Sequence, residues 1–251
     1  LTHQVTPLEY FLFDFPNRSR REKETFLPDQ WKDRLSMKNT SLQMFKSELS
    51  DKYAFYLLNK DFFCRNVFKV CYDNYESFYQ FVKKERAVFI KPNCASYGHG
   101  AFIYSYNDND VRSVFDNLVE SSAEYIAEGI IVQSDEMRKW NYSSVNTVRI
   151  PTVLTSKGFY VLGCFLRTGR KGAIVDNAGG GGIFAAIDDK SGMVISDGHD
   201  EYGHSYVSHP DSNIQFKGFQ LPDWQSVIDI AEKAHRGMPH HRIHSLRFCT
   251  Y

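Results

Sequence analysis

The stretch 87–100 decides the fold, and it is Ala-Val-Phe-Ile-Lys-Pro-Asn-Cys-Ala-Ser-Tyr-Gly-His-Gly. Its first four residues are apolar and β-favouring, which predicts a short buried strand that ends at Lys91. A loop of small residues follows, after which Phe102, Tyr104 and Tyr106 alternate as in a second strand. Glycines let backbone N–H groups approach anionic oxygens, and the lysine adds a positive charge. The stretch therefore predicts a hairpin that closes over polyphosphate, with an ordinary hairpin turn as the alternative.

The composition is typical of a globular chain, with 251 residues of which 42% are apolar and 24% charged. Thirty basic and thirty acidic residues cancel, so no global field favours nucleic acid or a membrane surface as partner. No apolar run approaches the ~20 residues of a membrane span, and no signal-peptide pattern opens the chain. Five scattered cysteines favour incidental thiols in a reducing cytosol. We therefore expect a cytoplasmic protein with no membrane span and no nucleic-acid partner.

Helix and strand signals are mixed along the whole chain. The mixture predicts the α+β class, with antiparallel sheets flanked by helices. Residues 159–166 are expected to return along 145–154 as the second strand of a hairpin, through the turn 156–158. The expected strands are 67–71, 87–90, 125–132, 145–154, 159–166 and 183–187, and the expected helices begin near Asp51, Asn74, Asp110 and Asp223.

Several motifs follow one another in the order found in ATP-grasp enzymes. The early ones are Lys52 in Asp-Lys, Lys91 in Ile-Lys-Pro, the loop 96–100 and the strand end 127–131. The later ones resemble the sugar-transfer-associated branch of that superfamily, which is related to alpha-L-glutamate ligases. They are the stretches 143–150, 166–169, 175–177 and 180–182 and the pair His209-Pro210. The resemblance covers residues 45 to 243.

The resemblance implies an ATP-grasp fold in which two α+β subdomains grip ATP between them. On this basis we expect an N-terminal helical extension over 1–50, a lobe with a glycine-rich lid over 51–132, and a C-terminal lobe over 133–251. The implied reaction is Mg²⁺-dependent activation of a carboxylate as acyl phosphate, followed by attack of an amine or similar nucleophile. The implied substrate is a carboxylate-bearing sugar or amino acid in polysaccharide or cell-envelope biosynthesis. A phosphotransferase on the same scaffold is an alternative, in which only the acceptor differs.

The resemblance also assigns a first group of nucleotide-binding residues. Lys52 and Lys91 match the two lysines that contact phosphate and the adenine edge, although Lys52 also fits a surface lysine of a helix. Ser96, Gly98 and Gly100 would donate backbone N–H groups to phosphate oxygens as a mobile lid.

A second group matches the hinge that reads the edge of adenine with its backbone. It comprises Glu128, Gly129 and Ile131. Glu128 is a carboxylate within an apolar strand, which also fits an edge residue that faces water. Gln133 and Asp135 lie where a ribose acceptor is usually found.

Two arginines are the expected catalytic residues. Arg149 and Arg167 are each the one charge in, or closing, a long apolar strand, which is costly unless an anion is paired with it. A guanidinium fits a carboxylate or a transferring phosphoryl group. The alternative is a structural salt bridge with Asp176 or Glu128. Asn177 would orient the substrate, or else cap a turn.

Asp176 is the expected Mg²⁺ ligand, because it is the best available acid near the phosphates. Family members end with an acidic residue on one strand and Glu-x-Asn on the next, which together hold Mg²⁺. In this chain the expected aspartate falls at Leu246 or Arg247, and the sequence ends before any Glu-x-Asn. A degenerate, non-catalytic nucleotide-binding module that lacks the metal ligands is therefore an alternative function.

Three further residues stay open between the site and the scaffold. Trp140 or Phe165 would line the adenine slot, although residues of this kind more often belong to the core. His209 would touch the acceptor, or it is a loop histidine without a role.

Overall fold

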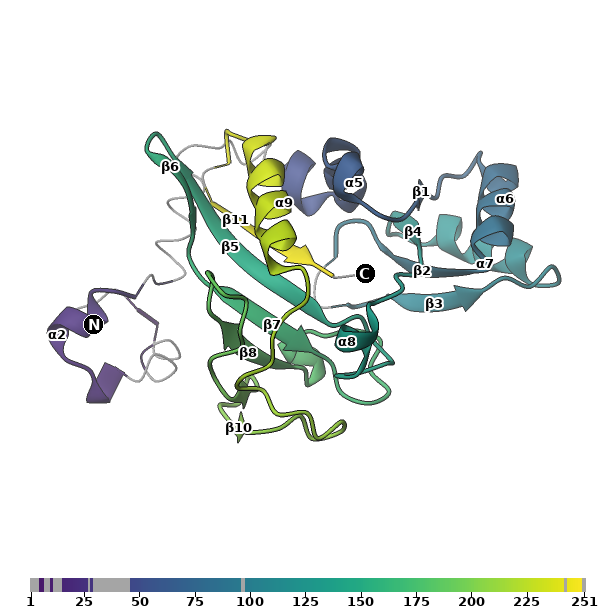
Figure 1. Ribbon diagram of the computed structural model, residues 1–251. Coiled ribbons are helices and arrows are strands. Elements are labelled where there is room, and N and C mark those ends of the chain that lie inside the picture. Colours follow the sequence, from purple (N-terminus) through teal and green to yellow (C-terminus); the bar gives the residue numbers. More distant parts are fainter. Residues whose placement is uncertain are drawn as a thin grey trace.

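In the computed structural model, the chain forms two lobes that are each built on an antiparallel sheet (Figure 1). The structure describes residues 5–6, 10, 15–26, 28, 46–95, 98–241 and 243–249. Much of the predicted N-terminal extension lies outside these residues. The described part of it holds α2 (Arg20–Lys23) and two short turns, Phe15–Asn17 and Lys46–Ser50.

The first lobe is a four-stranded sheet with two helices on one face (Figure 1). Phe78 and Val82 from one helix and Phe115 from the other pack against Val88 and Ile90 of the sheet. The strand order is β1-β4-β2-β3, with β1 (Val67–Lys69), β2 (Ala87–Pro92), β3 (Phe102–Ser105) and β4 (Tyr125–Gly129); the helices are α6 (Tyr75–Glu85) and α7 (Val111–Glu120).

The helix α5 (Lys52–Leu58) leads into this lobe, and Asp51 caps it by accepting a 2.8 Å hydrogen bond from the Ala54 N–H. The short turn Lys60–Phe62 follows it. The hairpin of β2 and β3 and the starts of α5 and α6 confirm the sequence predictions.

The second lobe is a seven-stranded sheet in the order β10-β9-β8-β7-β5-β11, with β6 paired to β5. The helix α9 (Trp224–Arg236) packs Val227 and Ala231 against Val148, Ile150 and Leu166. The strands are β5 (Thr147–Thr155), β6 (Gly158–Val161), β7 (Cys164–Thr168), β8 (Ile183–Ile187), β9 (Gly198–His199), β10 (Ser205–Tyr206) and β11 (Ile243–Phe248). Two short elements, α8 (Asp135–Arg138) and the turn Ala178–Gly180, complete the lobe.

One strand prediction is wrong in its extent. The run 159–166 is two strands, β6 and β7, which pair with different parts of β5. They are separated at Leu162 and Gly163, where the Leu162 N–H donates to the Pro151 carbonyl at 2.8 Å. A glycine inside an apolar strand pattern permits such a break, because it has no side chain to pack. The predicted α+β class is confirmed.

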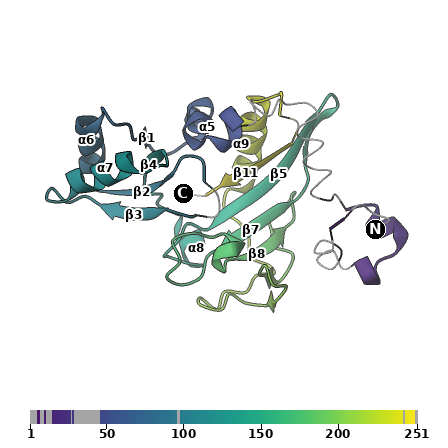
Figure 2. The same cartoon turned by 180° about the vertical axis from the view of Figure 1, so that it is seen from behind.

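Strand alternation places the charged residues opposite the helices. Val88 and Ile90 of β2 face α6 and α7, so Lys91, which follows Ile90, lies on the other face of the sheet. In β5 and β11, Ile150 and Leu246 are buried while Arg149 and Arg247 are exposed. β11 ends between the two sheets (Figures 1 and 2). The two helix-free faces therefore carry the cations.

Among the described residues, no helix combines the length and the apolar character needed to cross a membrane.

Candidate functional site

A buried ion-pair network lies on the helix-free face of the first sheet. Glu128 on β4 is only 5% exposed, and its Oε1 lies 2.8 Å from Lys91 Nζ. Its Oε2 lies 3.0 Å from Arg65 Nη2. Burial by itself raises the pKa of Glu128, but Lys91 and Arg65 hold that pKa below its usual value. The structure therefore places Glu128 in an ion-pair network rather than facing water.

The ammonium of Lys52 is engaged by the backbone of the loop that follows β2. Lys52 Nζ donates to the carbonyl oxygens of Pro92, Asn93 and Ala95, at 3.0, 2.9 and 2.6 Å. A lysine ammonium has three donors, so these contacts use all of them. Burial and then the charge of Lys91 lower the pKa of Lys52. Lys52 thus positions the start of the glycine loop in this structure, and its contact with phosphate stays a prediction.

A second polar network lies on the helix-free face of the larger sheet. Arg167 Nη2 is 3.4 Å from Asp176 Oδ1, and the Thr147 hydroxyl donates to the other oxygen of Asp176. Thr147 pairs directly with Arg167 across β5 and β7. Arg167 Nη1 is buried and has no hydrogen-bond partner among the described residues. Asp176 therefore neutralises Arg167 without satisfying all of its N–H groups.

The neighbouring arginines have fewer acidic contacts. Arg149 Nε donates to Ser245 Oγ at 2.7 Å, and Arg149 pairs directly with Arg247 across β5 and β11. Partial burial of the Arg149 side chain, and after it the charge of Arg247, lowers the pKa of Arg149. Burial also lowers the pKa of Arg167, against the opposing effect of Asp176.

The charge of Arg247 acts on both lobes. Burial is the largest cause of the lowered pKa of Lys91 on the first lobe, and Arg247 on the second lobe lowers that pKa further. Arg247 also contributes to the lowered pKa of Arg167. The lysine and the arginines thus lie within one electrostatic field, in which cations outnumber the carboxylates Glu128 and Asp176. Such a field attracts an anion to the space between the lobes.

The glycine-rich turn of the first lobe contacts the second lobe beside Asp176. Gly98 and Gly100 have φ values of 77° and 70°, which side chains other than glycine rarely adopt. A Cβ on Gly98 would lie 3.0 Å from Val175 Cγ1, and Val175 precedes Asp176. This packing joins the turn to the second lobe, and its role as a lid that donates to phosphate stays a prediction. The predicted donor Ser96 lies outside the described residues.

Part of the backbone of the predicted adenine hinge is already used in hydrogen bonds of the sheet. Glu128 pairs with strands on both sides, and the Gly129 N–H donates to the Asn66 carbonyl at 3.0 Å. Ile131 follows the end of β4 in chain that is free of strand pairing, so the residues just past the strand are better placed to read a ligand edge. Asp135 is exposed at the start of α8. The adenine and ribose assignments stay predictions.

Gln133 and Asn177 each make hydrogen bonds that hold a loop or turn of the second lobe. The Gln133 side chain donates to the carbonyls of Asn141 and Ser144 and accepts from Asn146, which fixes the loop before β5. The Asn177 carbonyl accepts the N–H groups that close the turn Ala178–Gly180. The Asn177 side chain makes no capping hydrogen bond to this turn, and its role toward substrate stays a prediction.

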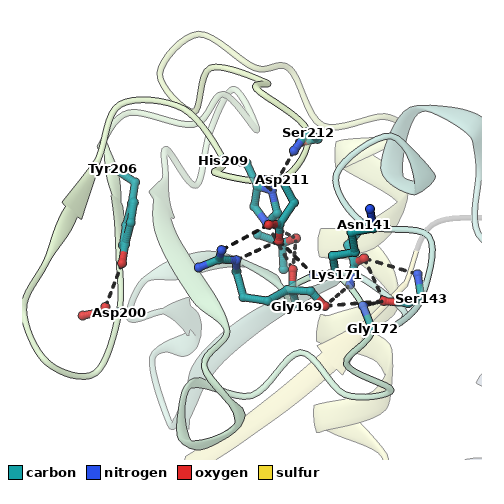
Figure 3. Close-up of polar contacts among 12 residues, drawn as sticks. Asn141, Ser143, Gly169, Lys171, Gly172, Asp200, Tyr206, His209, Asp211 and Ser212 are labelled. Carbon is teal, nitrogen blue, oxygen red and sulfur yellow. Dashed lines mark hydrogen bonds and ion pairs between the residues drawn. The ribbon is translucent and has the colours of Figure 1, made fainter.

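His209 holds a loop of the second lobe (Figure 3). Its Nε2 lies 3.1 Å from the Gly169 carbonyl, and its Nδ1 accepts the N–H groups of Asp211 and Ser212. This arrangement assigns the proton to Nε2 of a neutral ring. Trp140 is 1% exposed and stacks on Phe216. These contacts agree with scaffold roles for both residues.

The sequence predicts no role for Arg65 or for Arg247. Strand alternation could have indicated the position of Arg247, because Ser245 and Arg247 lie on one face of β11 while the buried Leu246 lies on the other. Nothing local to Arg65 indicates its pairing with Glu128, which lies 63 positions along the chain.

The chain was compared with known proteins. Among solved structures, it is similar to D-alanyl-alanine synthetase A from Vibrio cholerae O1 biovar eltor, with 8% identity and a TM-score of 0.45 over 81% of this chain and 51% of that chain. D-alanine–D-alanine ligase from Bacillus anthracis is 11% identical, with a TM-score of 0.44 over 81% of this chain and 53% of that chain. A third similar structure is the ATP-grasp ligase PsnB complexed with a phosphomimetic variant of its minimal precursor, Mg and ADP. It is 10% identical, with a TM-score of 0.46 over 98% of this chain and 62% of that chain.

The chain therefore spans 51% to 62% of the length of these solved chains. A search of curated protein sequences found no match. The family described as sugar-transfer associated ATP-grasp matches residues 47–250, which is most of the chain. The chain therefore belongs to the sugar-transfer associated ATP-grasp family.

Proposed function

We propose that this chain binds ATP with Mg²⁺ between its two lobes and serves an ATP-dependent ligase. The ligase would activate a carboxylate as acyl phosphate and join it to an amine or a similar nucleophile. The observation that carries the proposal is the buried Nη1 of Arg167, which has no hydrogen-bond partner among the described residues.

An anion next to Arg167 would remove a cost that the protein otherwise bears. Arg167 is 7% exposed, and leaving a buried donor unsatisfied costs about 1–3 kcal/mol, more for a charged group. Phosphate and carboxylate oxygens fit the planar guanidinium fork. Arg149 and Arg247 lie in the same field, so an anion held here would meet several cations at once.

Asp176 fits the role of one Mg²⁺ ligand. Mg²⁺ is usually bound by one or two carboxylates together with phosphate oxygens and waters. Asp176 supplies one such carboxylate beside the arginines, and Gly98 packs on the residue before it. When bound, the ion would neutralise phosphate charge. Lys91 would contact the phosphates from the first lobe, with Glu128 fixing the position of its ammonium.

In the proposed reaction, a carboxylate oxygen attacks the γ-phosphorus of ATP, and the bond to ADP breaks. The amine then attacks the acyl carbon, loses a proton, and phosphate leaves. Arg149 and Arg167 would stabilise the negative charge that builds on the transferring phosphoryl group and on the tetrahedral centre.

We further propose a carboxylate-bearing sugar or amino acid as substrate, in polysaccharide or cell-envelope biosynthesis. The description of the family as sugar-transfer associated supports the sugar part of this proposal. The five cysteines are all free thiols, which agrees with a reducing cytoplasm as the compartment of the reaction.

Calorimetric titration of ATP, with and without Mg²⁺, tests the nucleotide site. We expect ATP to bind the wild-type chain, and Arg167→Gln to weaken binding by at least about tenfold, since a charge-assisted contact is worth about 1.5–3 kcal/mol. Arg112→Gln is the control for affinity, because Arg112 is exposed on α7, where it pairs with Asp116 and lies over the Tyr75 ring of α6. A wild-type chain that binds no ATP would refute the proposal.

ADP release, measured by a coupled assay over a panel of acids and amines, tests the reaction. Turnover that requires both an acid and an amine supports a ligase. ATP binding without turnover over a broad panel would contradict it.

One observation favours a second candidate, a non-catalytic nucleotide-binding module. The exposed positions of β11 are Ser245 and Arg247, so the described strand offers the cleft no carboxylate for a metal ion. This candidate predicts ATP affinity that Mg²⁺ leaves nearly unchanged, whereas the ligase predicts a strong Mg²⁺ dependence.

A further inference from the structure

A cluster of histidines lies at the connection between α9 and β11, at the opposite end of β11 from Arg247. His240 and His241 are adjacent in this connection. Glu48, from the turn Lys46–Ser50, reaches both imidazoles. Its Oε2 is 2.8 Å from His241 Nε2 and also contacts His240 Nε2. The candidate ligand atoms of the three residues all lie within 4.8 Å of one another.

Two further histidines support this cluster from the sheet and from α9. His235 Nε2 donates to the His241 carbonyl at 2.8 Å, and its Nδ1 lies 2.8 Å from Thr152 Oγ1. His244 pairs with Thr152 across β5 and β11. The centroid of the His244 ring lies 5.3 Å from that of the His241 ring. His244 Nε2 is buried without a hydrogen-bond partner in the described chain. The backbone of His241 is thus held in place, with a spare imidazole nitrogen nearby.

The donor set has the chemistry of a transition-metal site. Imidazole nitrogen and carboxylate oxygen bind Zn²⁺ at about 2.0–2.2 Å, so ligand atoms that share a tetrahedral ion lie roughly 3.3 Å apart. The atoms of Glu48, His240 and His241 are within reach of this arrangement after small side-chain movements. Two imidazoles favour Zn²⁺ and similar ions over Mg²⁺, which prefers oxygen ligands.

We propose that Glu48, His240 and His241 form a binding site for a transition-metal ion of the Zn²⁺ type. Three protein ligands leave a fourth position, which water or the nearby His244 would fill. The site is separate from the proposed ATP cleft and does not depend on it.

The ion would link the segment Lys46–Ser50, which precedes α5, to the second lobe. Glu48 lies four positions before Lys52, which positions the glycine loop. A buried hydrogen bond already joins α5 to the α9–β11 connection. Asn59 at the end of α5 is 4% exposed and donates to Met238 Sδ at 3.7 Å. The metal would strengthen this junction of α5 with the α9–β11 connection.

Titration of Zn²⁺ alone into the tag-free, metal-stripped full chain, in competition with a chromophoric chelator, tests the site. We expect one ion per chain, and a rise of the melting temperature when Zn²⁺ is added, because binding to the folded state stabilises it. Glu48→Gln and His240→Ala should each weaken Zn²⁺ binding by at least about tenfold and remove the rise in melting temperature.

His204→Ala is the matched control. His204 also pairs with a carboxylate, Asp200, at 2.8 Å, but far along the chain from the cluster. Its loss should leave Zn²⁺ affinity unchanged. The side chain of His240 is 35% exposed, so the His240→Ala chain should fold, which circular dichroism checks.

Cobalt substitution excludes binding by the free cysteines. Co²⁺ in the proposed site should give visible ligand-field bands without the near-ultraviolet charge-transfer bands of thiolate ligands. The proposal is overturned if wild-type protein binds no Zn²⁺, if thiolate bands appear, if Glu48→Gln and His240→Ala bind as tightly as wild type, or if His204→Ala weakens binding equally.

Discussion

Arg149 and Arg247 are directly paired residues of the neighbouring antiparallel strands β5 and β11. Like charges placed opposite each other in this way destabilise a sheet by about 0.2–1 kcal/mol. The Nε of Arg149 donates to the hydroxyl of Ser245, which is not a carboxylate. The strand pair is therefore better suited to a bound anion than to the stability of the sheet.

Arg247→Gln should separate stability from binding. We expect the melting temperature to stay the same or rise, because the repulsion with Arg149 is removed. ATP affinity should fall by about tenfold or more, because Arg247 contributes to the field on both lobes. Thermal unfolding and calorimetry measure the two effects. Arg112→Gln is the control for affinity, which it should leave unchanged. A fall in the stability of Arg247→Gln without a change in its ATP affinity would contradict the interpretation.

The local parts of this site could be predicted from the sequence. The hairpin of β2 and β3 and the helices α6 and α9 follow from side-chain periodicity, which is a property of neighbouring residues. The isolated charges of Arg149 and Arg167 within apolar strands could be recognised as unusual, because burying an unpaired charge is costly. The structure places both on the helix-free face of the larger sheet, and their catalytic role stays a prediction.

The partners of the charged groups could not be predicted, because they depend on contacts between distant segments. Lys52 bonds to carbonyls some forty positions away, and Arg65 pairs with Glu128, which is 63 positions away. Glu48 meets His240 and His241 across nearly the whole chain. No periodicity within one segment carries such information.

Lys52→Met should destabilise the loop after β2. It would leave the carbonyl oxygens of Pro92, Asn93 and Ala95 without their donor, which costs about 1–3 kcal/mol when such groups are buried. We expect a lower free energy of unfolding in urea and faster proteolysis near the glycine loop. Lys60→Met, at an exposed position, is the control. Weaker ATP binding with unchanged stability and proteolysis would instead identify Lys52 as a phosphate contact.

Glu128→Gln should be strongly destabilising. The change removes the carboxylate that pairs with both Lys91 and Arg65 at a site that is nearly fully buried, and breaking a buried pair typically costs about 3–5 kcal/mol. Glu232→Gln is a matched control, because Glu232 pairs with Arg236 on an exposed helix face, where pairs are worth about 0–1 kcal/mol. Equal free energies of unfolding for the two variants would show that the buried network contributes little.

The protonation of His209 should lower stability in mild acid. Burial lowers the pKa of His209 from its ordinary 6.5, so the unfolded chain takes up this proton first. The contribution of the neutral ring is therefore complete above pH 6.5 and is lost as the pH falls toward the folded pKa. The Arg170 hydrogen bond lowers the pKa of Asp211 to about 2, so this carboxylate titrates at lower pH.

We expect the wild-type free energy of unfolding to fall between pH 7 and pH 5, by at most about 1.4 kcal/mol per pH unit for this proton. His209→Gln cannot take up the proton, so its stability should depend less steeply on pH over the same range. Identical slopes for the two proteins in urea unfolding would show that His209 is not responsible.

Gly98→Ala tests the contact between the glycine-rich turn and the second lobe. The φ of Gly98 is 77°, so any Cβ is strained there, by roughly 1–2 kcal/mol. Gly218 has a φ of 88° with nothing near its Cβ position, so Gly218→Ala carries the same backbone strain without a contact. Gly98→Ala adds the approach to Val175 Cγ1 at 3.0 Å.

We therefore expect Gly98→Ala to weaken ATP binding more than Gly218→Ala at similar loss of stability. Adding Val175→Ala should restore part of the affinity, because it removes the methyl group that the new Cβ would meet. If the two glycine variants bind ATP equally well, the turn does not close beside Asp176 in the nucleotide complex. If Val175→Ala gives no rescue, backbone strain rather than the contact between lobes limits binding.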